Sequence, residues 1–235
     1  MNIALFGYGK MGKMLEKLGS ARGHSFPMKI DVNTNTSELD FSTIDVAIDF
    51  STPDAAFANI KWCFEQGVPV ISGTTGWLDR YQEALNLCQK QNGAFIYASN
   101  FSLGVNIFFE LNKKLARMMK NLDDYQVSME EIHHIHKLDA PSGTAITLAE
   151  GIIENSKYSG WKLESASENE VFISAKREGE VPGTHVINYN SPVDAIEIKH
   201  TAHNREGFAL GALIAAEWIK DKKGVFSMKD VLNLV

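Results

Sequence analysis

The sequence contains little cysteine. Its two cysteines among 235 residues, Cys63 and Cys88, form no Cys-x-x-Cys motif, and both lie in segments with a helical pattern. We therefore interpret them as buried, reduced thiols rather than as a disulfide or a catalytic pair. No apolar run approaches the roughly 18 residues that a membrane-spanning helix needs, and the first residues, MNIALFGYG, lack the basic region of a signal peptide. These absences predict a cytoplasmic protein without a membrane segment.

The chain also has fewer basic than acidic residues. The chain has 23 Lys and Arg against 29 Asp and Glu, a formal net charge of -6. Such a surface repels polyanions, which argues against nucleic acid and anionic membranes as partners. Internal repeats, charge blocks and low-complexity linkers are absent as well. The length suits one large domain or two modest ones, and a small anionic ligand would need a local basic pocket.

Up to about residue 100, short apolar runs alternate with segments of helical periodicity. The third run, IDVAIDFS, is apolar nearly throughout, as in a strand of a parallel sheet that is covered on both faces. Strands that alternate with helices in this way predict a doubly wound α/β domain of the Rossmann type. We expect strands over 2–6, 27–31, 44–51, 67–76 and 93–100.

The pattern changes near Asn100 to Gly104. We expect a long helix over 101–119, a strand over 125–133, a helix over 142–155 and a final helix from near Glu206. Residues 171–204 are rich in β-branched side chains separated by Gly and Pro turn signals, which predicts an antiparallel meander. The change of architecture indicates a second domain, of the α+β type.

The stretch GYGKMG, residues 7–12, fits the G-x-G-x-x-G pattern in its proper context, because it follows an expected strand and opens an expected helix. Gly7 permits a tight turn, Gly9 lets the backbone approach a pyrophosphate, and Gly12 lets the helix pack on the strand. The helix N-terminus offers free N–H groups to phosphate. Asp31 ends the next strand, where it would accept hydrogen bonds from ribose hydroxyls and repel a 2′-phosphate. The sequence predicts a nicotinamide dinucleotide site that favours NADH.

Two alternatives stay open at this site. The glycines could serve only a tight turn between strand and helix, and Asp31 could be only a turn residue at a strand end. A 2′-phosphate could also be held by the basic and polar neighbours, so both NADH and NADPH are retained. Those neighbours are Lys10, Lys29, Asn33 and Thr34.

Two further turns follow expected strands. They are Gly73-Thr74-Thr75-Gly76 and Ala98-Ser99-Asn100-Phe101. Because ligands sit beyond the carboxyl ends of parallel strands, both turns are candidate contacts for the nicotinamide end of the cofactor. Asn100 could bind a carboxamide. Alternatively, each turn only satisfies the N–H groups of the helix that follows.

The stretch from Glu130 to Ala145, EEIHHIHKLDAPSGTA, contains three of the seven histidines. A metal site could use His133, His134 and His136, but neither a cysteine cluster nor paired carboxylates nor the spacing of a zinc helix accompanies them. We therefore expect no metal. A structural cluster at a strand end is a second interpretation. The third, which we favour, is proton transfer beside an anion site.

Elementary chemistry supports that third interpretation. Histidine titrates near working pH and so gains and loses a proton readily. Lys137 can donate a proton or bind a carboxylate, and Ser142 to Thr144 begin a helix whose N–H groups and hydroxyls form an anion site. In a straight strand His133 and Lys137 would lie ~13 Å apart. Joint action therefore requires the chain to bend after about His134.

Six motifs together resemble the 4-hydroxy-tetrahydrodipicolinate reductase family, also called the dihydrodipicolinate reductase family. In chain order they are GYGKMG, DFSTPDAA, SGTTGW, SNFSLGVN, EIHHIHKLDAPSGTA and HTAHNREGFALGALIAAEWI. The resemblance covers essentially the whole chain, and the histidine stretch is its most specific part. It implies an enzyme of the diaminopimelate route to lysine. That enzyme reduces the cyclic imine derived from 4-hydroxy-tetrahydrodipicolinate to tetrahydrodipicolinate with NADH or NADPH.

The resemblance also implies a role for each matching residue. His133 would be the catalytic acid/base and Lys137 the proton donor. The small dicarboxylate substrate would be bound by His134, Ser142, Gly143 and Thr144. The cofactor would be contacted by Gly7, Tyr8, Gly9, Lys10, Met11, Gly12, Asp31, Gly73, Thr74, Thr75, Ala98, Ser99, Asn100 and Phe101.

The domain organisation follows from the same resemblance. It implies that the final helix returns to the nucleotide domain, so the second domain is an insertion. The expected dinucleotide-binding domain is residues 1–102 and 205–235. The expected substrate-binding and oligomerisation domain is residues 103–204, whose sheets would pair in a homotetramer.

Two departures from the family pattern concern the site. Ile135 stands between the second and third histidines of the loop, where many members have arginine. The segment between Asp31 and Ile44 is shorter than in many relatives, and it borders the expected adenosine ribose.

Two other functions are compatible with a dinucleotide-binding domain followed by a second domain. A nucleotide-binding regulatory protein on the same fold, without catalysis, would be expected to have lost His133 or Lys137, and both are present. Another two-domain dehydrogenase, acting on a sugar or on aspartate semialdehyde, is the second. The semialdehyde enzymes need a nucleophilic cysteine, whereas Cys63 and Cys88 lie on expected helices.

Overall fold

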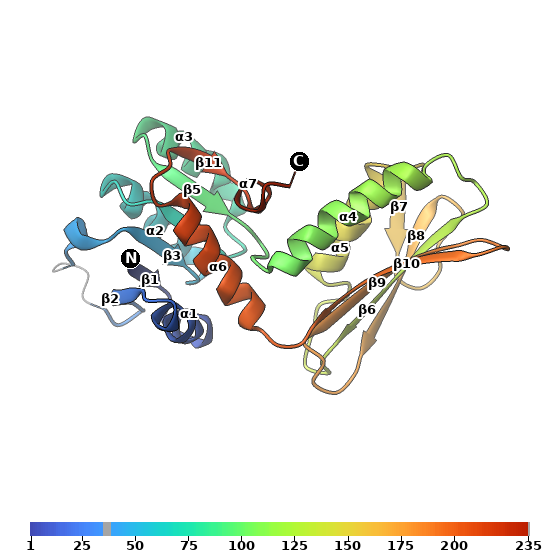
Figure 1. Cartoon of the computed structure of the whole chain (residues 1–235), viewed down its shortest axis with the longest axis horizontal. Coiled ribbons are helices and arrows are strands. Elements are labelled where there is room, and N and C mark those ends of the chain that lie inside the picture. The colour runs from blue at the N-terminus through green and yellow to red at the C-terminus, as the bar shows by residue number, and fades with distance from the viewer. Residues whose placement is uncertain (35–38, 235) are drawn as a thin grey trace. The chain divides into compact units, whose positions relative to one another are not determined.

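The computed structural model describes residues 1–34 and 39–234 (Figure 1). The chain divides into two compact units, one formed by Met1–Leu103 together with Glu206–Val235 and the other by Gly104–Arg205. Each unit has its own sheet and its own hydrophobic core. No helix in the described ranges is long and apolar enough to cross a membrane.

Within the described residues, the first unit is built on a six-stranded sheet in the order β11-β5-β4-β3-β1-β2. Every neighbouring pair in this sheet is parallel. The predicted Rossmann-type doubly wound sheet is therefore confirmed. The strands are β1 Asn2–Phe6, β2 Ser25–Ile30, β3 Val46–Asp49, β4 Val70–Ser72, β5 Ala94–Tyr97 and β11 Gly224–Phe226.

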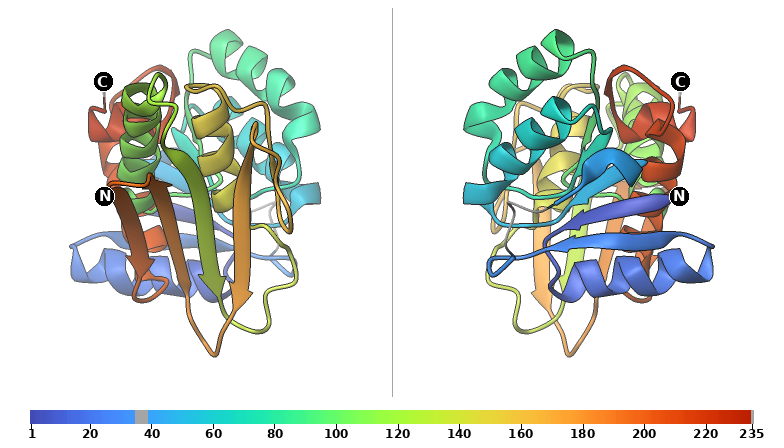
Figure 2. Two further views of the ribbon diagram at one scale, coloured as in Figure 1. Left: turned by 90° about the vertical axis from the view of Figure 1, so that its right-hand side faces the viewer. Right: turned by 90° about the vertical axis from the view of Figure 1, so that its left-hand side faces the viewer.

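Helices cover both faces of this sheet. Successive side chains of a strand point to opposite faces, so Ile3 and Leu5 of β1 pack with α1 and α6, whereas Ala4 and Phe6 pack with α2 and α3. The right-hand panel of Figure 2 shows α1 alongside β1 and β2. The helices are α1 Lys10–Ala21, α2 Pro53–Glu65, α3 Tyr81–Lys90, α6 Glu206–Ile219 and α7 Met228–Leu232.

The end of the chain adds two elements that the sequence pattern did not predict. Strand β11 has three residues and helix α7 has five, which is too short for hydrophobic periodicity to reveal. β11 pairs with β5, with Gly224 opposite Ala94. Met228 of α7 is buried in the same hydrophobic core as residues of α6. The last helix predicted from sequence is thus followed by an edge strand.

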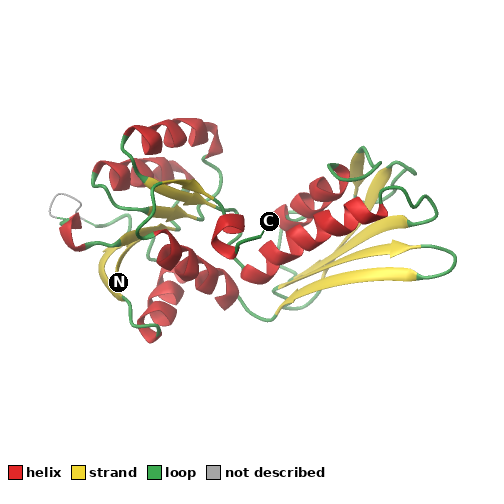
Figure 3. Cartoon of the chain, turned by 45° about the horizontal axis from the view of Figure 1, so that its top comes forward, coloured by secondary structure: helices red, strands yellow, loops and turns green. Residues whose placement is uncertain are grey.

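The second unit has, in the part that the structure describes, a mixed sheet of five strands in the order β10-β9-β6-β8-β7. Helices α4 Leu103–Met119 and α5 Gly143–Ile153 lie on one face of this sheet (Figures 1 and 3). Figure 2 shows the strands side by side in its left-hand panel. They are β6 Gln126–His133, β7 Gly160–Lys162, β8 Glu170–Arg177, β9 Gly183–Asn190 and β10 Ala195–Ala202.

The predicted antiparallel meander over 171–204 was only partly right. Strands β9 and β10 do form an antiparallel hairpin, but β8 pairs in parallel with β6 and not with β9. Strand β6 lies between β8 and β9. The link from Glu178 to Pro182 carries the chain past the end of β6, because five residues easily span the roughly 10 Å across one intervening strand. Local turn signals cannot distinguish this crossing from a hairpin.

We expect Gly211→Ala in α6 to destabilise the protein by about 2 kcal/mol or more. A Cβ at Gly211 would lie 1.8 Å from the carbonyl oxygen of Phe101, so helix and backbone would have to separate. The control is Gly207→Ala in the same helix, where the nearest described atom lies 3.7 Å from a Cβ. Urea unfolding checks both variants. Equal stability of the two would contradict this account of the contact.

Candidate active site

The glycine loop between β1 and α1 is shaped by close backbone contacts. Gly7 has a positive φ of 91°, and a Cβ there would lie 2.1 Å from the carbonyl oxygen of Phe50. A Cβ at Gly12 would lie 2.3 Å from the carbonyl oxygen of Gly7, so α1 packs directly on the loop. Around Gly9, the N-cap of α1, no described atom lies within 4 Å of a Cβ position. The backbone at Gly9 is therefore open to a ligand.

A cleft of about 330 Å³ opens beside this loop. Strand β1 lies between β2 and β3, so the strand order reverses there, which is where doubly wound sheets bind ligands. Among the described residues, no side chain caps the first N–H groups of α1, and such groups bind phosphate. The loop therefore fits a dinucleotide pyrophosphate. The cleft is lined by Gly7, Tyr8, Gly9, Ile30, Asp31, Val32, Phe50, Ser51, Thr52, Ala55 and Asn59.

Asp31 follows β2 and reaches this cleft. Its carboxylate accepts hydrogen bonds from the Asn33 N–H at 2.9 Å and from the Thr34 hydroxyl at 3.3 Å, which folds the segment into a turn. The side chain is exposed and can still meet a ribose. Lys29 forms an ion pair with Glu16, so one cation that could have held a 2′-phosphate is already engaged. Residues 35–38 lie outside the described ranges.

Asp49, at the end of β3, is a buried carboxylate that the sequence analysis did not identify. Its oxygens accept hydrogen bonds from the hydroxyls of Ser51, Ser72 and Thr74 at 2.6, 2.8 and 2.7 Å. The side-chain amide of Asn59 donates a fourth at 3.1 Å. Burial raises the pKa of Asp49, and these hydrogen bonds oppose the rise. The residue ties the ends of β3 and β4 to α2.

The two other predicted turns have well-defined internal partners. The carbonyl oxygen of Thr74 accepts a hydrogen bond from the Trp77 indole N–H at 2.7 Å. Asn100 accepts one from the Ser102 N–H at 2.9 Å, and Phe101 is only 1% exposed. The side chains of Thr74 and Phe101 are thus packed inward, whereas Thr75 and Ser99 are the exposed hydroxyl residues of these turns.

In the second unit, β6 ends at His133 and the chain turns at once. The Lys137 N–H donates a hydrogen bond to the carbonyl oxygen of His134 at 3.1 Å. The Ile135 N–H donates to the carbonyl oxygen of Gly179, also at 3.1 Å. The chain therefore bends directly after His134, as joint action of His133 and Lys137 requires.

The three histidines of the loop are separated by this bend. His133 is buried, at 8% exposure. His134 Nε2 lies 3.4 Å from the guanidinium of Arg205, and the exposed His136 lies 3.3 Å from Glu180. The structure therefore does not gather the three imidazoles around one point.

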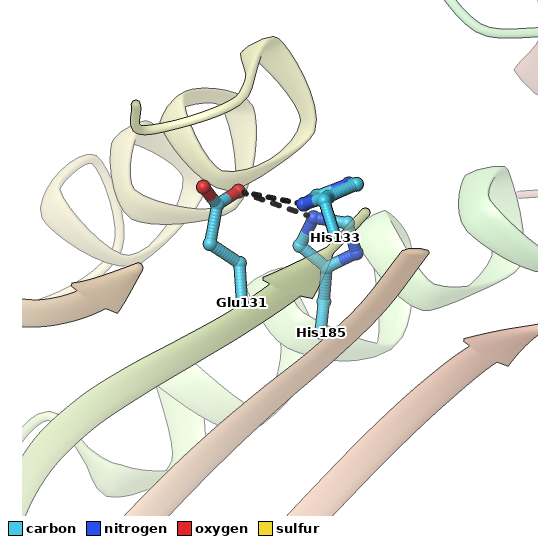
Figure 4. Close-up of side chains that lie close together, drawn as sticks. All are labelled: Glu131, His133 and His185. Atoms are coloured by element: carbon cyan, nitrogen blue, oxygen red, sulfur yellow. Dashed lines mark ion pairs between the residues drawn. The ribbon is translucent and has the colours of Figure 1, made fainter. Parts of the chain in front are cut away.

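His133 instead meets two residues that the sequence analysis did not select, Glu131 and His185 (Figure 4). Glu131 Oε2 lies 3.6 Å from His133 Nδ1 and 3.7 Å from His185 Nε2. In the described ranges this is the one trio of donor groups close enough to share a metal ion, with ligand atoms within 4.8 Å of one another. However, the guanidinium of Arg177 lies 3.1 Å from the same carboxylate and would repel a cation, so we assign no metal.

The pKa values of Glu131 and His133, which both lie on β6, are lowered for different reasons. Burial by itself raises the pKa of Glu131, but contacts with His185 and Ser142 outweigh it and lower the pKa to about 2. Burial lowers the pKa of His133 to about 4, although the Glu131 carboxylate opposes that shift. At neutral pH the site therefore holds a buried carboxylate beside a neutral imidazole.

Lys137 is held by a pair of contacts on the loop. Its Nζ lies 2.7 Å from both carboxylate oxygens of Asp139. Arg177 donates hydrogen bonds to the carbonyl oxygens of Lys137 and Asp139, which fastens the loop backbone to β8. The Lys137 ammonium can reach an incoming anion only by leaving or sharing Asp139.

The start of α5 is where the sequence analysis expected an anion site. Ser142 is its N-cap, and its hydroxyl accepts a hydrogen bond from the Ala145 N–H at 3.1 Å. The Ser142 side chain is buried and lies 3.2 Å from His185 Nε2. Gly143 is exposed, and no described atom lies within 4 Å of a Cβ there. The open approach to this helix end is therefore over Gly143.

Of the residues around His133, Glu131 could have been found from the sequence, whereas His185 and Arg177 could not. Glu131 lies two residues before His133, so strand alternation puts both on one face, and an acidic side chain facing inward needs a partner. His185 and Arg177 come from other strands. Sheet register places His185 opposite Glu131 and Arg177 opposite His133. No local pattern contains that register.

Two family models together span nearly the whole chain. The model described as "Dihydrodipicolinate reductase, N-terminus" matches residues 1–101, and the model described as "Dihydrodipicolinate reductase, C-terminus" matches residues 104–232. The chain belongs to the dihydrodipicolinate reductase family. The resemblance seen in the sequence motifs is thereby confirmed.

Two curated relatives carry the same name. A 4-hydroxy-tetrahydrodipicolinate reductase from Christiangramia forsetii is 60% identical over 234 residues, covering 99% of this chain and 98% of the relative. A 4-hydroxy-tetrahydrodipicolinate reductase from Buchnera aphidicola subsp. Schizaphis graminum is 35% identical, covering 93% of this chain and 81% of the relative. Both matches run through the two units.

Solved structures agree with the family fold. The dipicolinate-bound dihydrodipicolinate reductase from Paenisporosarcina sp. TG-14 superposes with a TM-score of 0.78 at 23% identity, covering 100% of this chain and 99% of that one. An aspartate dehydrogenase from Thermotoga maritima gives a TM-score of 0.52 at 14% identity, with coverage of 96% and 99%. At these identities the likeness concerns the fold.

Acid should destabilise the protein through His133. Its pKa is about 6.5 when unfolded and about 4 when folded, so the unfolded chain binds more protons between these values and stability falls as pH falls through that window. Relative to His133→Gln, the wild type should lose about 2 kcal/mol between pH 7 and pH 4.5. Urea unfolding across this range measures the difference. A constant difference would contradict the neutral, buried state of His133.

Proposed function

We propose that the chain reduces the cyclic imine derived from 4-hydroxy-tetrahydrodipicolinate to tetrahydrodipicolinate, in the diaminopimelate route to lysine, with NADH or NADPH. The observation that carries this proposal is the 60% identity to a 4-hydroxy-tetrahydrodipicolinate reductase over 99% of the chain. No comparison favours a regulatory protein without catalysis.

The first unit is proposed to bind the cofactor, which supplies the hydride when bound. Support comes from the open backbone at Gly9, the uncapped start of α1 and the exposed carboxylate of Asp31 at the cleft. The exposed residues of the turns after β4 and β5, Thr75 and Ser99 among them, would contact the nicotinamide end. The proposed cofactor residues are Gly7 to Gly12, Asp31, Gly73 to Thr75 and Ala98 to Phe101.

The second unit is proposed to bind the substrate and to transfer the proton. His133 would act as acid/base and Lys137 as proton donor. The helix start at Gly143 and Thr144 would hold a substrate carboxylate, with His134 beside it. Ser142 would act mainly through its cap of that helix, because its side chain is buried.

Cofactor preference, domain roles, oligomeric state and location are proposed on separate grounds. A preference for NADH follows from the carboxylate of Asp31 and from the engagement of Lys29 by Glu16. The division of roles between residues 1–102 with 205–235 and residues 103–204, and the homotetramer, stay predictions from the family resemblance. The cytoplasmic location stays a prediction from the composition and the first residues of the sequence.

We expect His133→Ala and Lys137→Ala each to lower kcat by about 100-fold or more, because proton transfer is removed from the reaction. The Kd for NADH should stay near the wild-type value, because the proposed cofactor residues are elsewhere. The matched control is His136→Ala, whose exposed side chain lies 3.3 Å from Glu180 and has its ring 6.0 Å from that of His134. Oxidation of NADH with freshly generated cyclic substrate gives kcat. Wild-type turnover in both variants would refute the assigned roles.

The wild type should use NADH at least as well as NADPH. Replacing Asp31 by Asn removes the charge that repels a 2′-phosphate, and should shift the ratio of kcat/KM values towards NADPH by about tenfold. The control is Asp79→Asn, an exposed change outside the cleft. Steady-state kinetics with both cofactors measure the ratio. A strong wild-type preference for NADPH would overturn the role of Asp31.

A further inference from the structure

Glu131 is the most fully buried charged group beside His133, and its partners come from four segments. The side chain is 1% exposed. Its Oε1 meets the guanidinium of Arg177 on β8 at 3.1 Å, and its Oε2 accepts the Ser142 N–H at 3.0 Å. The imidazoles of His133 on β6 and His185 on β9 face Oε2 at 3.6 and 3.7 Å. The carboxylate is thus the common centre of these groups.

The contact with His133 selects one ring nitrogen. Nδ1 faces the carboxylate at 3.6 Å, and no hydrogen-bond partner within the described residues occupies it. The opposite edge of the ring faces Gly183, where a Cβ would lie 3.1 Å from Nε2. A proton on Nδ1 is favoured by the carboxylate, so Nε2 is left as the nitrogen that can exchange a proton. The absence of a side chain at Gly183 keeps that nitrogen uncovered.

The charge on Glu131 opposes the other influences on His133. Burial, His185, Lys137 and Arg177 all disfavour the imidazolium, and only the Glu131 carboxylate favours it among the groups that face the ring. At 3.6 Å the pair is too long for a direct hydrogen bond, so the carboxylate acts through its charge, which favours a proton on the facing Nδ1 of the neutral ring and stabilises the imidazolium. Without that carboxylate, proton uptake at His133 would be harder still.

The same carboxylate also holds the loop that carries Lys137. Arg177 bridges Glu131 to the backbone of Lys137 and Asp139. At the other end of the loop, Glu131 accepts the N–H of Ser142. The two proposed proton-transfer groups are therefore positioned by one buried charge.

We propose that Glu131 is a positioning residue for the reduction: its carboxylate orients His133 with Nδ1 protonated and Nε2 free, and stabilises the imidazolium that forms during proton transfer. The proposal rests on the proposed function for the role of His133 in turnover. It adds a role for Glu131 to that function, since the family resemblance implied no role for this residue. The tautomer of His133 is a property of the protein alone.

The test compares Glu131→Gln with Glu130→Gln. Glu130 is the neighbour on β6, points to the other face of the strand and pairs with Lys176. NMR of isotope-labelled histidines in the full chain gives the tautomer and the pKa of His133, and steady-state assays give kcat and its pH profile. For Glu131→Gln we expect a lower His133 pKa, a mixture of tautomers and a kcat reduced by at least about tenfold. Glu130→Gln should leave all three unchanged.

The outcomes are distinguishable. A loss of turnover in Glu131→Gln with an unchanged tautomer, pKa and pH profile would mean that Glu131 only anchors the loop, and would overturn the proposal. Should this variant fail to fold, the wild type still decides, because a His133 protonated on Nε2 at neutral pH contradicts the proposal. A wild type that does not reduce the cyclic imine, but whose His133 responds to Glu131→Gln as expected, would refute the proposed function and leave the positioning intact.

Discussion

A carboxylate removed from water must be surrounded by hydrogen-bond donors and positive charge, because an unpaired buried charge costs several kcal/mol. Glu131 satisfies this requirement with Arg177, His185 and the N–H of Ser142. These groups belong to β8, β9 and the start of α5, so one charge fixes the relative positions of three elements around β6. The geometry of the His133 loop depends on that constraint.

The first unit contains a buried carboxylate of a different kind. Asp49 receives only neutral donors, three hydroxyls and an amide, and burial raises its pKa, whereas that of Glu131 is lowered to about 2. Asp49 therefore suits a fixed scaffold behind the cleft that is proposed to bind the cofactor. Glu131 keeps a full charge, which can act on a neighbouring proton.

Much of the fold was predictable from the sequence, because the first unit repeats a strong local pattern of apolar strands and amphipathic helices. The glycine spacing at residues 7–12 could be interpreted because it follows an apolar strand and opens a helix, although the close contact of Gly7 is with Phe50, far away in the sequence. The pairing of β8 with β6 was not predictable, because turn residues specify where a strand ends and not which strand it joins. Strand β11 was too short to carry a pattern.

The sequence by itself determined the family and the Rossmann-type sheet, since these follow from residues that are neighbours in the chain. The bend after His134 was a requirement for joint action of His133 and Lys137, and the structure supplied it. Only the tertiary structure decided which groups surround His133. Glu131 lies opposite His185 and His133 opposite Arg177 through the registers of two strand pairs. Register is set by packing of the whole sheet against α4 and α5, so no short stretch of sequence contains it.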